Sequence, residues 1–359
     1  MNLYLAISLF LWIVAAYLAW RAERVYRNLP EIPRVEDNPS LPSLSIIIPA
    51  RNEAKALPIL LKSLSEQKYS TSLEVIVVDD DSQDETSRVA ESFDVKVIRL
   101  TELPPGWLGK PHACQVGADA ASGDWLLFTD ADTIHQNRSA SSAVQYASQN
   151  KMDALSLFLK HITTGWYDAV VLGTAFTGLF AGWGSMKDMF NGQFILVKRS
   201  VFKSSGGFEM VRQAPVEDVA LGRQLQQLGY STPVLRGEQL ASVHMYRSIS
   251  QLWHGMTRLG SGTLSYSPVS MFLMVIFIAQ IASPVFHLVQ ASLRQVNWMV
   301  PLIAWILAIP MVIFWMRRIR FAGLAGLAPL SAVFIIFSAL WGVAQRLTGF
   351  GNQWKGRRV

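Results

Sequence analysis

The hydrophobic and polar positions of this chain divide it into apolar ends and an alternating middle. Near the amino terminus, residues 3–20 are almost uncharged and are long enough to cross a bilayer. Three further apolar segments of spanning length lie near the other end, at residues 269–290, 298–316 and 321–344. The pattern predicts four membrane segments around one polar region.

The polar region alternates between short apolar runs and helical patterns. Strand-like runs cover residues 44–48, 73–78, 95–100 and 125–129, and helical spacing covers residues 54–67, 84–93 and 111–121. Repeated strand–helix units are typical of a mostly parallel sheet that helices cover on both faces. The predicted fold class is therefore α/β, with transmembrane helices added at both ends.

Basic residues indicate how the first apolar segment is oriented. Arg21, Arg24 and Arg27 follow it directly, and such residues accumulate on the cytoplasmic side of membranes. A cleaved signal peptide is the alternative, but no basic residue precedes the apolar run and no convincing small-residue cleavage site follows it. We expect a retained anchor in the cell membrane, a multi-pass protein and a cytoplasmic polar domain.

The last apolar segment does not fit this orientation rule, because arginines flank it on both sides. They are Arg317, Arg318 and Arg320 before it, and Arg346, Arg357 and Arg358, together with Lys355, after it. An arrangement in which one of the three late segments is re-entrant or lies flat would remove the conflict.

The expected domains are an anchor at 1–20, a proline-containing linker at 21–43, the polar domain at 44–250, membrane segments within 268–345 and a basic tail at 346–359. Residues 165–183 are also apolar and contain several small residues. A fifth crossing there would put Glu217 and Asp132 on opposite sides of the membrane. We therefore expect this segment to lie at the interface.

Composition narrows the class further. The chain has 51% hydrophobic and 16% charged residues, which is too apolar for one soluble domain. Its net charge of +6 comes from basic residues beside the apolar segments, which favours contact with anionic lipids over nucleic acid. The single cysteine, Cys114, excludes an intramolecular disulfide. No GxGxxG or GxxxxGK[ST] motif follows the first strand, so dinucleotide and P-loop sites are not indicated.

Two clusters of carboxylates end predicted strands. Asp79-Asp80-Asp81-Ser82 follows the second strand, and Asp130-Ala131-Asp132 follows the strand at 125–129. Ligands of open α/β sheets bind at the carboxyl ends of the strands. The clusters therefore predict a site for a nucleotide and a metal ion there, with solvated turns as the alternative.

The clusters also resemble a family pattern. With Pro49-Ala50-Arg51-Asn52-Glu53 and Glu217-Asp218, they resemble the motif series of family 2 glycosyltransferases of the GT-A fold over about residues 44–235. The segments at 103–110, 245–248 and 354–358 are similar to those of membrane-bound enzymes associated with carotenoid and hopanoid glycosylation. The resemblance implies a nucleotide-sugar donor and a divalent cation.

Roles for individual residues follow from that resemblance. It implies that Asp132 holds Mg²⁺ or Mn²⁺, that Asp130 faces the metal or the ribose, and that Lys110 faces the nucleotide or diphosphate. Beside Pro49, it implies that Asp79 or Asp80 contacts the base and that Glu53 contacts the base or ribose. Arg247 could pair with the diphosphate, with an interfacial arginine beside the membrane as the alternative. The alternative for Lys110 is an ordinary surface lysine. A divalent cation suits the chemistry, because it neutralises charge that builds on a departing diphosphate.

Asp218, next to Glu217, is the expected general base. An acceptor hydroxyl must lose its proton as it attacks the anomeric carbon, and one positioned carboxylate can accept that proton. Direct displacement would invert the anomeric configuration. The alternative is that both carboxylates only favour the positive end of the helix that starts there.

The sequence departs from the family pattern at several positions. Asp81 stands where a small residue is common and is expected to point to solvent or to cap the next helix. Gln115 replaces an asparagine, which leaves a sugar contact there open, whereas the glycines before Phe208 suit close approach to a ligand. The Gln-x-x-Arg-Trp motif of processive members is absent, although Trp253 could line an acceptor cleft. His244 and His254 are interpreted as structural.

The leading hypothesis is transfer of one hexose from a nucleotide sugar, UDP-glucose in particular, to a carotenoid, hopanoid or other polyprenoid membrane lipid. A catalytic domain held at the bilayer by apolar segments suits such an acceptor. The alternatives are a processive polysaccharide synthase and a membrane scaffold that binds nucleotide sugars without turnover.

Overall fold

The computed structural model describes residues 3–35, 40–183, 190–262 and 267–348, with the short pieces 353–354 and 357–358. It contains two compact units. The helical unit comprises Met1–Asn28, Ile162–Ser185 and Met245–Asn352, and the sheet unit comprises Leu29–His161, Met186–His244 and Gln353–Val359. Lys355 and Gly356 of the closing segment lie outside the described residues.

The sheet unit is built on a sheet of seven described strands in the order β3-β2-β1-β4-β8-β6-β9. They are β1 (Leu44–Ala50), β2 (Leu73–Asp80), β3 (Lys96–Leu100), β4 (Trp125–Phe128), β6 (Ala154–Phe158), β8 (Ile195–Lys198) and β9 (Val234–Arg236). The first four are mutually parallel, as is the pair β6–β9, whereas β8 is antiparallel to its neighbours β4 and β6. This confirms the mostly parallel α/β sheet.

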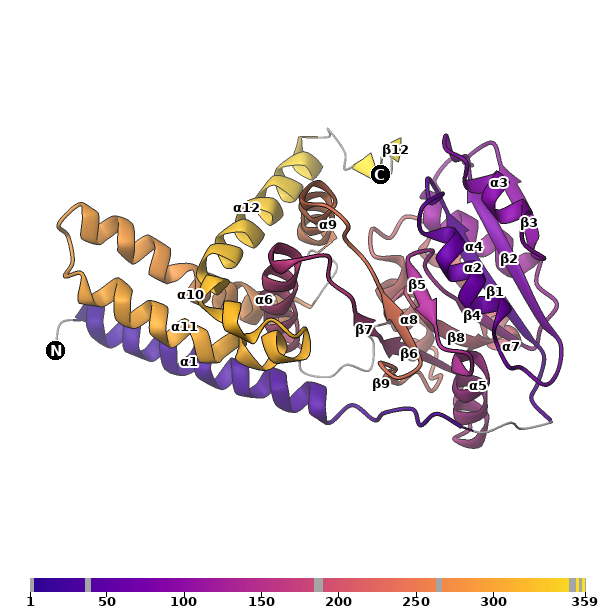
Figure 1. The fold of residues 1–359 in the computed structure, drawn as a ribbon, viewed down its shortest axis with the longest axis horizontal. Helices are drawn as coiled ribbons and strands as arrows, with labels where there is room; N and C mark the ends of the chain where they lie inside the picture. Colours follow the sequence, from indigo (N-terminus) through magenta and orange to yellow (C-terminus); the bar gives the residue numbers. More distant parts are fainter. Residues whose placement is uncertain are drawn as a thin grey trace. The chain divides into compact units, whose positions relative to one another are not determined.

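Helices connect the parallel strands (Figure 1). They are α2 (Leu57–Ser65), α3 (Thr86–Glu91), α4 (Gly109–Asp119), α5 (Ser139–Gln149), α7 (Arg199–Ser204) and α8 (Glu217–Gln227), with the 3₁₀ helix η2 (Gly207–Val211). Helix α4 packs on β1 and β2 through Gly117, where a Cβ atom would come within 2.5 Å of Ile47. The glycine thus allows the close helix–sheet contact that fixes the amino end of α4 above the strand ends.

A second sheet of three described strands pairs the segment just after β4 with strands from later in the chain. Its strands are β5 (Thr133–His135), β10 (Ala241–Val243) and β7 (Lys160–His161), in the order β5-β10-β7. The connector after the first helix is also fastened, because the Ile32 N–H donates to Arg236 O at 3.1 Å and Arg236 N–H donates to Pro30 O at 2.8 Å.

The helical unit contains six described helices and one 3₁₀ helix. They are α1 (Leu3–Arg27), α6 (Trp166–Gly182), α9 (Ile249–Gly262), α10 (Pro268–Ser292), α11 (Met299–Arg318), η4 (Ala322–Leu327) and α12 (Ala328–Leu347). Four stretches are long and apolar enough to cross a membrane, namely Ala6–Arg27, Pro268–Ser292, Met299–Arg318 and Ala322–Leu347. The apolar ends that the sequence predicts are therefore helical, which fits membrane association.

One helix of this unit extends beyond its predicted bounds, and another packs against helices that the sequence did not indicate. Helix α1 continues to Arg27, so the first residues of the predicted linker are helical, with Ala22 and Tyr26 buried. Helix α6 packs against α1, α10, α11 and α12, so most of its apolar surface contacts protein. Its location at the membrane interface stays a prediction.

Candidate functional site

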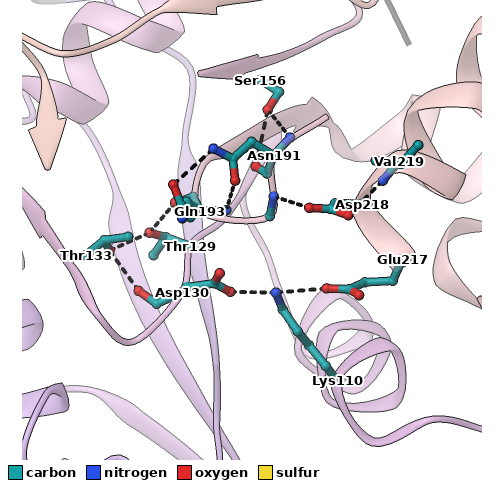
Figure 2. Close-up of polar contacts among 11 residues, drawn as sticks. Lys110, Thr129, Asp130, Thr133, Ser156, Asn191, Gln193, Glu217, Asp218 and Val219 are labelled. Carbon is teal, nitrogen blue, oxygen red and sulfur yellow. Dashed lines mark hydrogen bonds and ion pairs between the residues drawn. The ribbon is translucent and has the colours of Figure 1, made fainter. Parts of the chain in front are cut away.

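Lys110 joins two carboxylates from distant parts of the chain. Its Nζ atom lies 2.7 Å from Asp130 Oδ1 and 2.8 Å from Glu217 Oε1, and the Lys110 side chain is only 14% exposed (Figure 2). Lys110 comes from the first turn of α4, Asp130 from the end of β4 and Glu217 from the start of α8. The structure therefore brings together three residues that the sequence placed at one site.

Asp218 is held by two backbone N–H groups. Gly192 N–H donates to its Oδ2 at 2.6 Å, and Val219 N–H donates to its Oδ1 at 2.8 Å (Figure 2). Pro49, Cys114, Thr129 and Phe208 line the same pocket as Lys110, Asp130, Glu217 and Asp218. The carboxylate is thus fixed in orientation within a pocket at the carboxyl end of β1 and β4.

Burial and neighbouring charge perturb the pKa values of this group. Burial, and then the like charge of Glu217, raise the pKa of Asp218 to about 6, while Lys110 and the two N–H groups oppose the rise. Burial lowers the pKa of Lys110, but the three carboxylates outweigh it and raise that pKa well above its usual range. At neutral pH the site therefore combines a charged ammonium with a carboxylate poised to accept a proton.

The first carboxylate cluster is organised by local hydrogen bonds. Asp79 accepts from the backbone N–H of Ser82 at 3.0 Å and from the Ser87 hydroxyl. Asp80 is 1% exposed. Asp79 thus stabilises the turn into α3, and its predicted contact with a base, like that of Asp80, stays a prediction.

The Asp81 side chain is 38% exposed, which fits the solvent-facing alternative, and it also pairs with Arg51. The Asp81 backbone is left-handed, with φ of 54°, and its Oδ2 lies 3.4 Å from Arg51 Nη1. Arg51 also donates to the carbonyl oxygens of Asp80 and Asp81, so it ties the ends of β1 and β2 together. The prediction that Asp81 caps the next helix is wrong, because Asp84 Oδ1 accepts from Thr86 N–H at 3.0 Å instead.

Pro49 and Glu53 lie on the segment that links β1 to α2. Pro49 lines the pocket, whereas the described bonds of Glu53 are made by its backbone: its N–H donates to Thr86 Oγ1 at 2.7 Å, and its carbonyl accepts from Leu57 N–H at 2.9 Å. A contact between Glu53 and the base or ribose stays a prediction.

Asp132 lies beside the strand pair β5–β10. Its backbone carbonyl accepts a 3.0 Å hydrogen bond from the N–H of His244, which the pairing of the two strands brings there. In the described part of the chain no three His, Cys, Asp or Glu side chains converge as a metal cage. Carboxylates at Asp130 and Asp132 suit a hard cation that completes its coordination with water and phosphate oxygens.

Three other residues from the sequence analysis contact neighbouring protein groups. Arg247 lies in the helical unit, where its N–H donates to Gln251 Oε1 at 2.8 Å, so its role at the diphosphate stays a prediction. Trp253, in the same unit, packs edge-on against Phe334 with ring centroids 5.4 Å apart. In the sheet unit, Gln115 Oε1 accepts from Phe208 N–H at 2.9 Å.

The two glycines before Phe208 serve packing. Gly206 and Gly207 have φ of 79° and 54°, and a Cβ atom on Gly207 would come within 2.6 Å of the Phe202 ring and 2.7 Å of Gln115 Oε1. The close approach expected at this loop is therefore made to protein side chains.

The turn at Asn191 and Gly192 was missed by the sequence prediction. Asn191 N–H donates to Ser156 Oγ at 2.7 Å, and Gln193 O accepts from Thr129 Oγ1 at 2.9 Å (Figure 2). These bonds anchor the turn whose N–H group holds Asp218. An Asn-Gly pair is a recognised turn signal, but nothing in it points to Asp218, which is distant in sequence.

A mostly parallel sheet with carboxylates at the ends of β2 and β4, a bridging lysine and a carboxylate pair at a helix start is the arrangement of an α/β enzyme of the GT-A glycosyltransferase class. The family model described as "Glycosyl transferase family 2" matches residues 45–219. The chain belongs to this family.

Relatives and solved structures agree with this assignment. The chain is 30% identical over 280 residues to a 4,4'-diaponeurosporenoate glycosyltransferase of Staphylococcus haemolyticus, covering 74% of this chain and 72% of the relative. The protein of that name from Staphylococcus aureus is 30% identical over 88% of both chains. A mannosyltransferase from Pyrobaculum calidifontis, solved with GDP-Man and Mn²⁺, shares the fold with a TM-score of 0.58 at 19% identity, covering 94% of this chain and 98% of its own. These relatives are thus named for a carotenoid acceptor, which agrees with the resemblance to carotenoid-associated enzymes noted in the sequence.

Proposed function

We propose that this protein is an inverting glycosyltransferase that moves a hexose from a nucleotide sugar, UDP-glucose in particular, to a polyprenoid membrane lipid such as a carotenoid or hopanoid. The observation that carries the proposal is that two groups lie in one pocket. Asp218 is fixed there by the N–H groups of Gly192 and Val219, and Lys110 bridges Asp130 and Glu217. The names of the relatives support the lipid acceptor, and the apolar helices support a membrane location. The arginines that follow the first apolar segment support a cytoplasmic side for the sheet unit.

Each residue has a proposed task. Asp218 accepts the proton of an acceptor hydroxyl while the acceptor oxygen bonds to the anomeric carbon. The bond from that carbon to the diphosphate oxygen breaks, and the nucleoside diphosphate leaves with the electron pair. Lys110 provides positive charge for the diphosphate, and Glu217 holds the ammonium in position. A divalent cation at Asp130 and Asp132, when bound, would supply further neutralisation of the leaving group.

The acceptor group decides whether a base is required. A hydroxyl keeps its proton at neutral pH and needs Asp218 to remove it, whereas a carboxylate attacks already ionised. Replacement of Asp218 therefore distinguishes an alcohol acceptor from an acid acceptor. With an acid acceptor, Asp218 would only orient the reacting groups.

Mass spectrometry of extracted lipids tests the proposal. Cells supplied with candidate polyprenoids would express the wild type, Asp218→Asn, or the matched control Asp94→Asn, which removes an exposed carboxylate outside the pocket. We expect a lipid heavier by one hexose with the wild type and the control, and with Asp218→Asn only if the acceptor group is a carboxylate. A growing ladder of sugar would indicate a polysaccharide synthase, and binding of nucleotide sugar without any product would indicate a scaffold.

A further inference from the structure

Helices α1 and α11 end at the same end of the helical unit. The Arg318 guanidinium donates to the Tyr26 hydroxyl at 2.9 Å and lies 4.4 Å from the Tyr26 ring, and Arg27 lies 5.1 Å from the Phe314 ring. We call this the arginine end, defined by Arg21, Arg24, Arg27, Arg317, Arg318 and Arg320. Because α1 and α11 both finish there, the two helices run in the same direction.

Helix α6 lies against this end. Its Ala181 carbonyl accepts a hydrogen bond from Arg21, and its Phe180 ring stacks on Trp315 with centroids 4.9 Å apart. Gly182 packs directly against the carbonyl of Ser270, near the start of α10. Helix α10 therefore starts at the arginine end and runs away from it, and α11 returns.

The chain turns back into the helical unit after α11. Trp305 Nε1 donates to Gly326 O, at the end of η4, with a distance of 2.7 Å. Trp305 lies about 20 Å before Arg318 along the axis of α11. The segment η4 thus runs back alongside α11 to about two thirds of a membrane's hydrocarbon depth, and α12 begins there.

Helix α12 then returns to the arginine end. Ser331, in its first turn, shares a 2.7 Å hydrogen bond with Thr174 of α6. One turn later, Phe334 and Ile335 pack in the same cluster as Ile319 and Phe321, the residues that follow α11 directly. Along α12 the chain therefore returns from the middle of α11 toward the arginine end.

The second half of α12 runs beside α9 (Figure 1). Gly260 of α9 packs against the backbone of Ala339, where a Cβ atom would come within 2.4 Å. The outer face of α9 is mixed, because Gln251, His254 and Arg258 are exposed together with Ile249 and Leu259. A helix with such a face is suited to the boundary between the membrane and water. Because α12 runs beside α9, we infer that α12 does not cross the membrane.

The side of α12 that faces away from these helices is apolar. Leu330, Phe337, Leu340, Trp341 and Leu347 are each more than half exposed, whereas Ser338 and Gly342 on the other side are buried. The exposed residues recur at intervals of three, four and seven, so they form one stripe along the helix.

We propose that η4 and α12 form a re-entrant hairpin in the leaflet at the arginine end, with the apolar stripe of α12 immersed in the lipid of that leaflet. The chain then crosses the membrane three times, by α1, α10 and α11. Arg346 joins the arginine end, where the positive charge matches anionic headgroups. The charge conflict across the last apolar segment disappears.

Thiol labelling of the full-length protein in sealed membrane vesicles tests the topology. Exposed positions in the sheet unit, in the α10–α11 loop and after α12 would be changed one at a time, as Glu66→Cys, Gln295→Cys and Thr348→Cys. We expect an impermeant maleimide to reach Thr348→Cys from the same side as Glu66→Cys, and Gln295→Cys from the other. Labelling of Thr348→Cys from the same side as Gln295→Cys would overturn the hairpin. Wild type is the background control, because Cys114 is 2% exposed.

A depth measurement tests the lipid contact separately. Spin labels at Phe337→Cys and at Ile306→Cys, an exposed position in the middle of α11, would be compared for access to oxygen and to a water-soluble nickel complex. The proposal expects the label at position 337 to be in lipid but shallower than that at 306. Equal depth would indicate a crossing helix, and full access to the nickel complex would show that the stripe faces water. Either result contradicts the proposal.

Discussion

The backbone N–H of Gly192 donates a 2.6 Å hydrogen bond to Asp218 Oδ2, and the same glycine leaves room for Lys110. A Cβ atom at position 192 would lie 2.9 Å from Lys110 Nζ and 3.2 Å from Asp218 Oδ2. One residue without a side chain therefore sets the separation between the proposed base and the bridging cation.

Replacing Gly192 by alanine should slow turnover more than it weakens donor binding. The added methyl group displaces Lys110 and Asp218 from their contacts, and a misplacement of about 1 Å can reduce a rate about 100-fold. Steady-state kinetics of Gly192→Ala would give kcat and the KM for the donor. Gly323→Ala is the matched control, because a Cβ atom there meets nothing within 4 Å. An unchanged kcat for Gly192→Ala would contradict this role.

Activity on a hydroxyl acceptor should decline in acid with an apparent pKa near 6. Asp218 has a pKa of about 6, so it is ionised above that pH and able to accept a proton. Below it, each pH unit should lower kcat about tenfold. A pH–rate profile measures this limb. A profile that stays flat down to pH 5 would exclude Asp218 as the base with that acceptor.

Lys110→Gln should move this acid limb to higher pH and reduce activity. The ammonium lowers the pKa of Asp218, so its removal lets burial and Glu217 raise that pKa further. The donor should also bind less tightly, because the diphosphate loses a positive partner. Lys203→Gln changes an exposed lysine of the same unit and should leave the profile unchanged. If Lys110→Gln kept the wild-type profile, the electrostatic coupling would be refuted.

Chelation of divalent cations should abolish turnover, and Mg²⁺ or Mn²⁺ should restore it. Asp132→Asn should require more cation for half-maximal activity, since an amide oxygen is a weaker ligand than a carboxylate oxygen. Titration of the metal-free protein with each cation, with Asp94→Asn as control, gives these values. Full activity in excess chelator would exclude a metal requirement.

Acid should destabilise the sheet unit through His135. Burial lowers the pKa of His135 to about 4, whereas an unfolded histidine titrates near 6.5. Between these values the unfolded state binds more protons, so stability is complete above about pH 6.5 and falls toward pH 4, by up to about 3 kcal/mol. Melting temperatures from pH 7.5 to 5 in detergent would measure the slope. His135→Gln should reduce the slope without abolishing it, because burial also lowers the pKa of His161 in this unit to about 4, whereas exposed His254→Gln should leave it unchanged.

Local patterns predicted the core of the sheet unit because each element carries its own signal. The buried isoleucines of β1 and the carboxylates after β2 and β4 could be read directly, and so could the helix that starts at Glu217. The bridge from Lys110 joins Asp130, 20 positions later, to Glu217, 107 positions later, and no local period encodes such contacts. Gly192 was missed for the same reason.

The last apolar helix illustrates a second limit. Length and hydropathy describe α12 as well as they describe α10 or α11, because both measures ignore what the helix packs against. Its direction is indicated by tertiary contacts such as the bond from Trp305 to Gly326 and the cluster around Ile319.

The position of Cys114 has a chemical consequence. It is the single cysteine of the chain, it lies one helical turn after Lys110, and burial raises its pKa well above the usual value. Only thiolates react readily with peroxides and disulfides, and this sulfur, although it lines the pocket, is held as a protonated thiol. The enzyme should therefore keep its activity under oxidative stress that inactivates proteins with exposed thiolates.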